Sequence, residues 1–146
     1  MVRYAAPSPY MELSHTADVG IRAWGQELAE VYARAALAMA QLQAGGGAVE
    51  ATGEEKVVEA GGEDPPSLLV DLCRKVLAAF FLERRLLAAI EIAEISSTRL
   101  KACCRFGAFD PERHGEGMDI KAVTYARAAV TPRPEGGYEA TLIFDI

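Results

Sequence analysis

The chain has 146 residues, of which 51% are hydrophobic and 25% charged, and its formal net charge at pH 7 is −6. A chain of this length can bury roughly two thirds of its unfolded surface, so we expect one domain over residues 1–146. The acidic balance, without a run of Lys or Arg, argues against stable direct binding of nucleic acid. No stretch reaches the roughly 20 apolar residues of a membrane span and no signal-peptide pattern is present, so we expect a cytoplasmic protein without a membrane partner.

The first part of the chain predicts strands followed by a helix. Residues 10–13 and 19–24 are strand candidates on either side of a polar turn, and the second of them alternates apolar and polar residues. Apolar residues then recur every three or four positions over 28–42, which predicts an amphipathic helix ended by the glycines at 45–47. The charged segment 49–60 alternates only weakly, and we expect one or two modest strands there.

The second part predicts another helix and then a series of strands. The prolines of the loop 61–66 precede this helix, Ser67 is a possible cap, and apolar residues at helical spacing carry it to about Arg85. Alternation then predicts strands near 90–95, 100–106, 119–130 and 138–146. This order favours an α+β fold, in which a two-layer sandwich has two main helices on one face of a mixed, mostly antiparallel sheet.

The cysteines are expected to be structural. Cys73, Cys103 and Cys104 are odd in number and contain no CxxC pair. Cys103 and Cys104 are neighbours in an expected strand and would point to opposite faces of it. We therefore expect buried thiols rather than disulfides or a zinc site.

Two acidic positions near the two ends of the sequence form the main candidate site. Asp18 lies between the first two expected strands, where a short carboxylate can bond turn amides, ligate a metal or act as a base. Asp145 precedes Ile146 at the end of the last expected strand and is either a solvated charge or a ligand. If the fold joins these ends, the two carboxylates and the main-chain carboxyl of Ile146 repel one another or hold a hard cation such as calcium or magnesium.

The rest of the sequence offers no convincing nucleophile. The loop 110–114 could be an acid–base cluster, but we favour a turn in which Arg113 and His114 could contact a phosphate or a partner. The glycines at 45–47 lack the features of a phosphate-binding loop, and no nucleophile elbow is present. These observations weigh against an independent enzyme.

Three segments, in order along the chain, resemble the signatures of the archease family. They are Glu-Leu-Ser-His-Thr-Ala-Asp-Val-Gly-Ile at 12–21 with Gly25 and the expected helix 28–42, Asp-Pro-Glu-Arg-His at 110–114 followed by Ile-Lys-Ala-Val-Thr-Tyr at 120–125, and Ile-Phe-Asp-Ile at 143–146. Together the three segments span nearly the whole chain.

The resemblance implies an accessory protein of RNA repair and transfer-RNA splicing. Archeases activate the RtcB-type RNA ligase, which joins RNA ends with GTP and manganese; they promote guanylylation of the ligase's histidine, allow multiple turnovers and broaden its nucleotide use. The resemblance also implies a divalent-metal site near the two chain ends, most often calcium, with magnesium or manganese as alternatives. Carried onto this chain, its ligands are Asp18, Asp145 and the main-chain oxygens of Ile146.

Partner contacts are expected in the matching segments, from His15, Thr16, Arg113, His114 and Lys121. The chain also departs from the family at two places. Archeases commonly have Trp-Leu-Asn-Glu in the second helix, where this chain has Asp-Leu-Cys-Arg-Lys at 71–75, and Tyr125-Ala126 stands where the family has Tyr-His.

Two other functions compete with the ligase activator. A metal-dependent hydrolase would use Asp18, His15 and His114 and would turn over a small substrate by itself. A general chaperone or scaffold would bind many unfolded chains without depending on Asp18.

Overall fold

Eight strands and three helices follow one another in the computed structural model, which describes residues 2–14, 18–53 and 55–146. In chain order they are β1 (Arg3–Ala5), β2 (Met11–Ser14), β3 (Asp18–Gly25), α1 (Leu28–Ala44), β4 (Lys56–Gly61), α2 (Pro65–Glu83), β5 (Arg85–Ile95), β6 (Arg99–Ala108), α3 (Pro111–His114), β7 (Ala122–Pro132) and β8 (Tyr138–Asp145).

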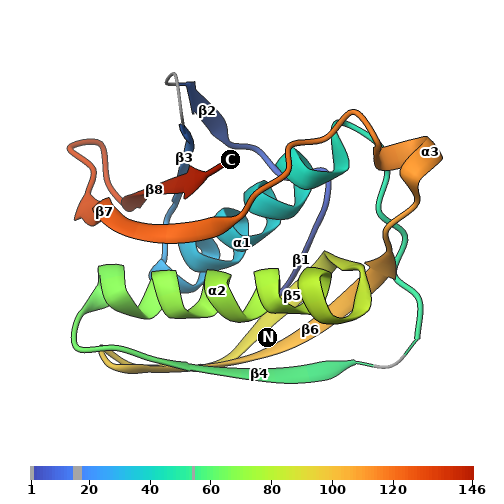
Figure 1. The fold of residues 1–146 in the computed structure, drawn as a ribbon. Coiled ribbons are helices and arrows are strands. Elements are labelled where there is room, and N and C mark those ends of the chain that lie inside the picture. Colours follow the sequence, from blue (N-terminus) through green and yellow to red (C-terminus); the bar gives the residue numbers. More distant parts are fainter. Residues whose placement is uncertain (1, 15–17, 54) are drawn as a thin grey trace.

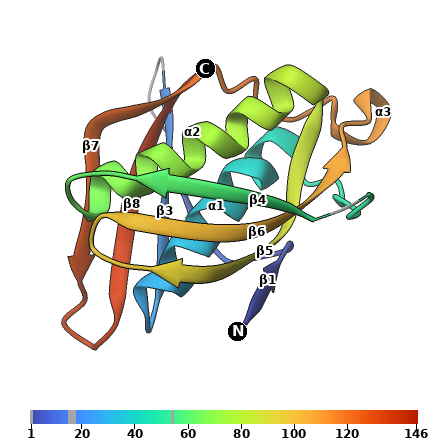
Figure 2. The same cartoon turned by 90° about the horizontal axis from the view of Figure 1, so that it is seen from below.

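The strands form two four-stranded sheets with the long helices between them (Figures 1 and 2). One sheet, which we call sheet A, has the order β1-β5-β6-β4, and the other, sheet B, has the order β2-β3-β8-β7. Every described strand pair is antiparallel. The predicted α+β class with mostly antiparallel strands is confirmed, but the strands divide into two sheets instead of the single predicted sheet.

The composition of α1 explains the second sheet. Beyond the predicted apolar stripe, Ala33, Ala36, Leu37 and Ala40 on its other sides are also buried. A helix that is apolar nearly all round must be covered on more than one side. In this fold α1 contacts β5 and β1 of sheet A and β3 and β8 of sheet B.

Capping residues define the end of α1 and the start of α2. Gly45 terminates α1 in the left-handed conformation (φ 62°), which glycine adopts without steric cost. At the start of α2, Asp64 is the N-cap: its side chain accepts a hydrogen bond from the Ser67 amide at 2.9 Å, and the Ser67 hydroxyl accepts one from the Asp64 amide at 3.1 Å. Ser67 is therefore the third residue of a capping box and not the cap itself.

Helix α2 fills the opening between one edge of each sheet. On the side of sheet B, Arg74 Nε donates to the carbonyl oxygen of Val123 in the edge strand β7, at 3.0 Å. On the side of sheet A, Asp71 Oδ2 accepts from the amide of Gly61 in the edge strand β4, at 2.9 Å. These side chains bind backbone groups that the edge strands would otherwise leave to solvent.

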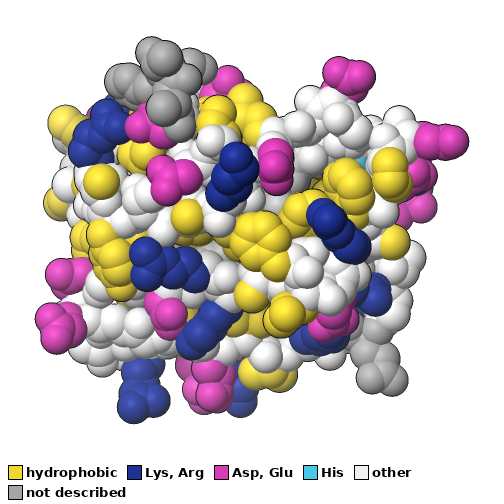
Figure 3. Space-filling view, in the orientation of Figure 1, with side chains coloured by type: hydrophobic (Ala, Val, Ile, Leu, Met, Phe, Trp, Pro, Cys, Tyr) yellow, Lys and Arg dark blue, Asp and Glu magenta, His cyan; other side chains and the backbone are white. Residues whose placement is uncertain are grey.

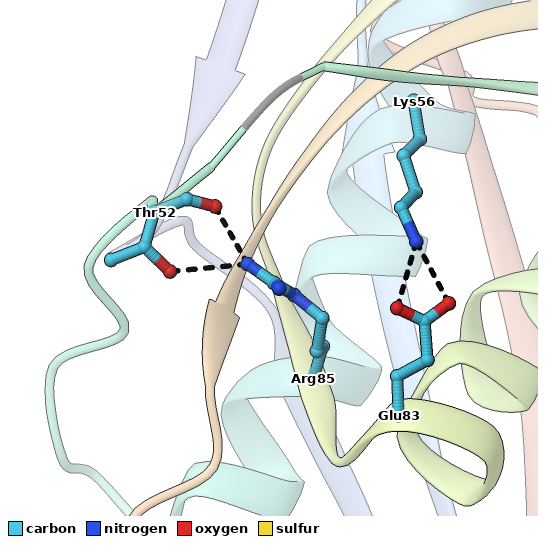
Figure 4. A network of polar contacts seen from close by, with 4 residues as sticks. All are labelled: Thr52, Lys56, Glu83 and Arg85. Carbon is cyan, nitrogen blue, oxygen red and sulfur yellow. Dashed lines mark hydrogen bonds and ion pairs between the residues drawn. The ribbon is translucent and has the colours of Figure 1, made fainter.

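Further polar contacts join the end of α2 to β4, and the start of β5 to the loop that precedes β4 (Figure 4). Lys56 Nζ of β4 lies 2.8 Å from each carboxylate oxygen of Glu83, the last residue of α2. Just after the helix, Arg85 Nη2 donates to the carbonyl and hydroxyl oxygens of Thr52, at 2.7 and 3.1 Å. Lys56 is the main reason that the pKa of the Glu83 carboxyl lies below its usual value.

Several short features differ from the predictions. β1 and the single-turn helix α3 were not predicted as regular elements, and β5 begins at Arg85 instead of near residue 90. Short elements carry too few residues to display a period, so only their tertiary contacts define them. In the described part of the chain, no helix is long and apolar enough to cross a membrane.

Candidate metal centre

Strand pairing brings the two acidic positions together. β3 begins at Asp18 and β8 ends at Asp145, and the two residues are direct partners in the antiparallel register of these strands. Asp145 lies in the middle of three strands, because its other register partner is Ala122 at the start of β7. The predicted convergence of the two acidic positions is therefore present in the fold.

The two carboxylates lie on the outer face of sheet B. The neighbours Val19 and Phe144, also register partners, are buried at 1% and 0% exposure and point toward the helices. Because side chains alternate along a strand, Asp18 and Asp145 point the other way. Directly opposed residues have β-carbons roughly 4.5–5.5 Å apart, and like charges in such a pair destabilise the sheet.

Gly20 lets the neighbouring strands close over this face. A β-carbon at Gly20 would lie 2.7 Å from Ile143 Cδ1 and 3.3 Å from Leu13 Cβ. A larger residue would push apart the side chains of β2 and β8 that meet over β3. The tight packing beside Asp18 thus depends on glycine at this position.

The two oxygens of Asp18 have different surroundings. Oδ2 accepts a hydrogen bond from Arg127 Nη2 at 3.2 Å, in an ion pair whose arginine and aspartate side chains are 55% and 25% exposed. Oδ1 is buried and has no hydrogen-bond partner among the described residues. A buried carboxylate oxygen without a hydrogen-bond donor has lone pairs that a cation could use.

The backbone of Asp145 is held by the residue that precedes β7. The amide of Lys121 donates to the carbonyl oxygen of Asp145 at 2.8 Å, so this oxygen already has a partner. Ile146 follows with 43% exposure, and its main-chain oxygens extend beyond the strand pairing. The centre thus places two carboxylates next to the exposed residue Ile146.

The donor set fits a hard cation only with help from the main chain and solvent. No group of three His, Cys, Asp or Glu side chains able to hold a metal occurs among the described residues. Asp18 and Asp145 provide two carboxylates, and the main-chain oxygens of Ile146 would complete the protein's part. Calcium accepts carboxylate, carbonyl and water oxygens in a loose shell, whereas magnesium demands a regular octahedron and usually keeps several waters.

Arg127 belongs to this centre through its ion pair with Asp18, although no sequence pattern singles it out. It lies in a bulge of β7, where the register with β8 shifts between Thr124 and Ala129. Its backbone is left-handed (φ 59°), a conformation that few non-glycine residues adopt. No local sequence pattern predicts this geometry, because the bulge is defined by the pairing of β7 with β8.

Four of the five expected contact residues remain predictions. His15 and Thr16 lie outside the described residues. Arg113 and Lys121 are exposed, and the Arg113 guanidinium lies 3.5 Å from the carboxylate of Glu50. Both remain predicted partner contacts.

His114 is placed differently from the prediction. Its side chain is 2% exposed, and both ring nitrogens are bonded: Nδ1 accepts from the Asp110 amide at 3.0 Å, and Nε2 lies 2.8 Å from the carbonyl oxygen of Ala48. This pairing requires the proton on Nε2. The side chain is therefore not available at the surface for a partner, and it joins α3 to the loop after α1.

The structure also weakens the hydrolase alternative. α3 lies away from the start of β3 in both ribbon views (Figures 1 and 2), and the ring nitrogens of His114 in α3 bond to Asp110 and Ala48 instead of Asp18. All three cysteines are free; Cys73 and Cys104 are buried as predicted, and Cys103 is half-buried. Burial raises the pKa of Cys73 and of Cys104 to about 12, so both thiols stay protonated and are poor nucleophiles near neutral pH.

Three residues of α2 that depart from the family pattern, Asp71, Arg74 and Lys75, have intramolecular roles. Arg74 of α2, besides its bond to β7, stacks over the ring of Tyr125 with 4.7 Å between guanidinium and ring centroid.

Phe81 and Leu82 near the end of α2 are 51% and 82% exposed, and Tyr125 is 53% exposed. Figure 3 looks onto α2 and β7 and shows hydrophobic side chains interspersed with Lys and Arg and with Asp and Glu on this face.

Comparison with known proteins gives one consistent result. The model of the Archease protein family (MTH1598/TM1083) matches residues 10–146. Protein archease of Pyrococcus abyssi (strain GE5 / Orsay) is 33% identical over 136 residues, covering 90% of this chain and 94% of that protein. Protein archease-like of Drosophila melanogaster is 31% identical over 143 residues, covering 94% of this chain and 90% of that protein.

A solved structure extends the comparison to the fold. The solution structure of Methanobacterium thermoautotrophicum protein 1598 superposes with a TM-score of 0.70 at 29% sequence identity, covering 94% of this chain and 98% of that chain. None of the names of these three relatives states a reaction. Sequence and fold agree over almost the full length of the chain, which therefore belongs to the archease family.

Proposed function

We propose that this protein is an accessory protein that activates an RtcB-type RNA ligase in the cytoplasm. It promotes guanylylation of the ligase's histidine and allows the ligase to turn over repeatedly. It does not itself catalyse a reaction. The tip of sheet B, which we define as Asp18, Asp145, Ile146 and Arg127, holds a divalent cation, most readily calcium, and docks at the metal and nucleotide cleft of the ligase.

The observation that carries this proposal is the register pairing of Asp18 with Asp145. The two carboxylates lie on one face of a rigid antiparallel pair, and Asp18 Oδ1 is buried with no partner among the described residues. The chain combines this anionic tip with family membership and with two buried cysteines that are unsuited to nucleophilic attack. Such a tip is suited to holding a cation and presenting it to another protein.

The chain's own residues position the tip rather than perform chemistry. Pairing of β3 with β8 places the backbones of the two aspartates opposite each other, and the Lys121 amide holds the main chain of Asp145. A bound cation would supply positive charge and Lewis acidity at the tip. Docking then selects the ligase conformation in which the nucleotide is aligned with the histidine.

The decisive experiment is a ligation assay with a purified RtcB-type ligase, GTP, manganese and RNA with joinable ends. Adding the wild-type protein should increase ligase guanylylation and turnover. Asp18→Asn, Asp145→Asn and deletion of Ile146 should each reduce that stimulation at least about tenfold, equivalent to about 1.4 kcal/mol of lost coupling. Because exposed ion pairs contribute about 0–1 kcal/mol, the folded state should survive these changes, as far-UV circular dichroism can verify.

Glu94→Gln is the matched control, since Glu94 is an exposed carboxylate on β5 of the other sheet. It should stimulate the ligase as well as the wild type does. Full stimulation by Asp18→Asn would exclude the tip, and absence of stimulation by the wild type would refute the activator. Turnover of a small substrate without ligase would favour the hydrolase, and protection of several unrelated unfolded chains by wild type and Asp18→Asn alike would favour the chaperone.

A further inference from the structure

The tip of sheet B contains a positively charged side chain, the guanidinium of Arg127. Asp18 and Asp145 face each other across a strand pair, and the guanidinium of Arg127 lies 3.2 Å from Asp18 Oδ2. The strand order β3-β8-β7 means that Arg127 reaches Asp18 across the intervening strand β8. The guanidinium thus neutralises part of the repulsion between the opposed carboxylates.

The backbone at Arg127 is unusual in a way that serves this contact. Residues 125–128 of β7 form the bulge between the paired residues Thr124 and Ala129, and Arg127 has φ 59°. A left-handed non-glycine residue costs on the order of 1 kcal/mol or more, and such outliers persist where surrounding structure imposes them. Bulges also re-aim side chains beside functional sites.

A divalent cation at the tip would compete with the guanidinium for the same carboxylate. Asp18 Oδ2 is occupied by Arg127, while Oδ1 is buried without a partner among the described residues. A cation bound through Asp18 would lie within a few ångströms of the guanidinium, and the two positive charges would repel each other. Metal binding would therefore weaken or break the Asp18–Arg127 ion pair.

We infer that Arg127 is a built-in competitor of the cation: it sets the metal affinity of the tip and is released from Asp18 when the metal binds. This inference rests on the proposed metal site and adds its regulation. Release of a half-exposed guanidinium at the edge of the tip changes the charge that the tip presents to its partner. Cation occupancy and the docking surface are thereby coupled through one side chain.

Calorimetric titration of calcium into the metal-free protein tests the inference without the ligase. Arg127→Gln and Arg127→Gly should each bind calcium about tenfold more tightly than the wild type, because a competing positive charge is gone. Glycine accepts φ 59° without strain, so agreement of the two variants separates loss of charge from relief of the backbone. Arg3→Gln, which removes a comparably exposed, ion-paired arginine from β1, should leave the affinity unchanged.

A second measurement reads the charge balance of the metal-free tip. Without calcium, Arg127→Gln should melt at a lower temperature than the wild type, because two opposed carboxylates lose their counter-ion. Saturating calcium should restore the melting temperature to that of the calcium-bound wild type. At about 1 M NaCl, where the Debye length is about 3 Å, the difference in calcium affinity should shrink.

The outcomes separate this inference from the proposed function. If the wild type binds calcium but both Arg127 variants bind it equally or more weakly, the competitor is refuted and the metal site stands. If only Arg127→Gly binds more tightly, backbone strain is the cause and the competitor is again refuted. If the wild type binds calcium, magnesium and manganese no better than Asp18→Asn, the metal site and the inference both fail, and the ligation assay alone judges ligase activation.

Discussion

At the scale of single residues, Asp18 shows a cost that folding alone does not explain. One of its oxygens is paired with Arg127, and the other is buried without a partner among the described residues. Leaving a buried polar atom unsatisfied costs about 1–3 kcal/mol, and placing a second carboxylate opposite adds repulsion. A residue kept at such a cost is expected where binding rather than stability determines its identity.

The individual site residues differ in how far the sequence could reveal them. Asp18 and Asp145 could be singled out because an isolated carboxylate at a strand end is visible in the sequence and matches a family signature. Arg127 could not, since its place depends on a bulge opposite β8. The signature segment 110–114 predicts a partner contact for His114, whereas both of its ring nitrogens are bonded in the interior.

The buried thiols predict an alkaline loss of stability. Burial raises the pKa of Cys73 and Cys104 from 9.0 to about 12 in the folded protein. The folded state therefore holds these protons more tightly than the unfolded state, and stability is complete below about pH 9 and is lost as pH rises toward about 12. The free energy of unfolding, from urea titrations, should fall over this window by up to about 1.4 kcal/mol per pH unit for each thiol.

Thiol reactivity provides the check on that prediction. In the native protein at pH 8, Ellman's reagent should modify at most the half-buried Cys103 quickly, and all three cysteines should react in urea. Cys73→Ala should show a shallower alkaline slope than the wild type. Rapid modification of all three thiols in the native state, or an equal slope in the variant, would contradict the assignment of the alkaline transition to buried thiols.

At the scale of secondary-structure elements, α2 is the bridge between the two sheets. Its side chains bond to the backbone of β7 on one side and of β4 on the other. Both strands are edges, and edge strands need such covering to avoid pairing with other chains. In this chain the residues that replace the family's usual second-helix run therefore hold the fold together, whatever contact they make with a partner.

Arg74 gives this bridge a measurable contribution. Arg74→Ala removes the bond to the Val123 carbonyl and the stacking on Tyr125, and should lower the free energy of unfolding by about 1 kcal/mol. Urea denaturation followed by circular dichroism measures the change. Arg99→Ala, at an exposed arginine that begins β6, is the control and should change stability by less than about 0.5 kcal/mol. Equal losses in both variants would show that α2 does not bridge the sheets through Arg74.

Element length explains which elements could be predicted. α1 and α2 span enough turns for their apolar spacing to be unmistakable, and β6 and β8 alternate over many residues. β1 and α3 are a few residues long and exist because they pair with β5 and pack against α1. The cap of α2 was misplaced because Asp64 and Ser67 both suit the N-cap position, and only the backbone conformation distinguishes them.

At the scale of the whole molecule, one hydrophobic core serves both sheets. Apolar residues of sheet A and sheet B belong to the same buried cluster, joined through α1 and α2. We therefore predict that the two sheets unfold together as one domain. The fluorescence of Trp24, the sole tryptophan and a residue of β3, and far-UV circular dichroism should give coincident urea transitions. Two separate midpoints would show that sheet B can unfold while sheet A remains.

By itself the sequence determined the α+β class and the two long helices, because these follow from local periodicity, and it singled out Asp18 and Asp145 as candidates by residue type and family signature. The tertiary structure alone decided that the strands form two sheets around the helices, and that β3 pairs with β8 in the register that opposes Asp18 and Asp145. It also decided that Arg127, 109 positions from Asp18 in sequence, supplies the counter-ion. Contacts between distant segments depend on how whole layers pack, and no local pattern encodes that choice.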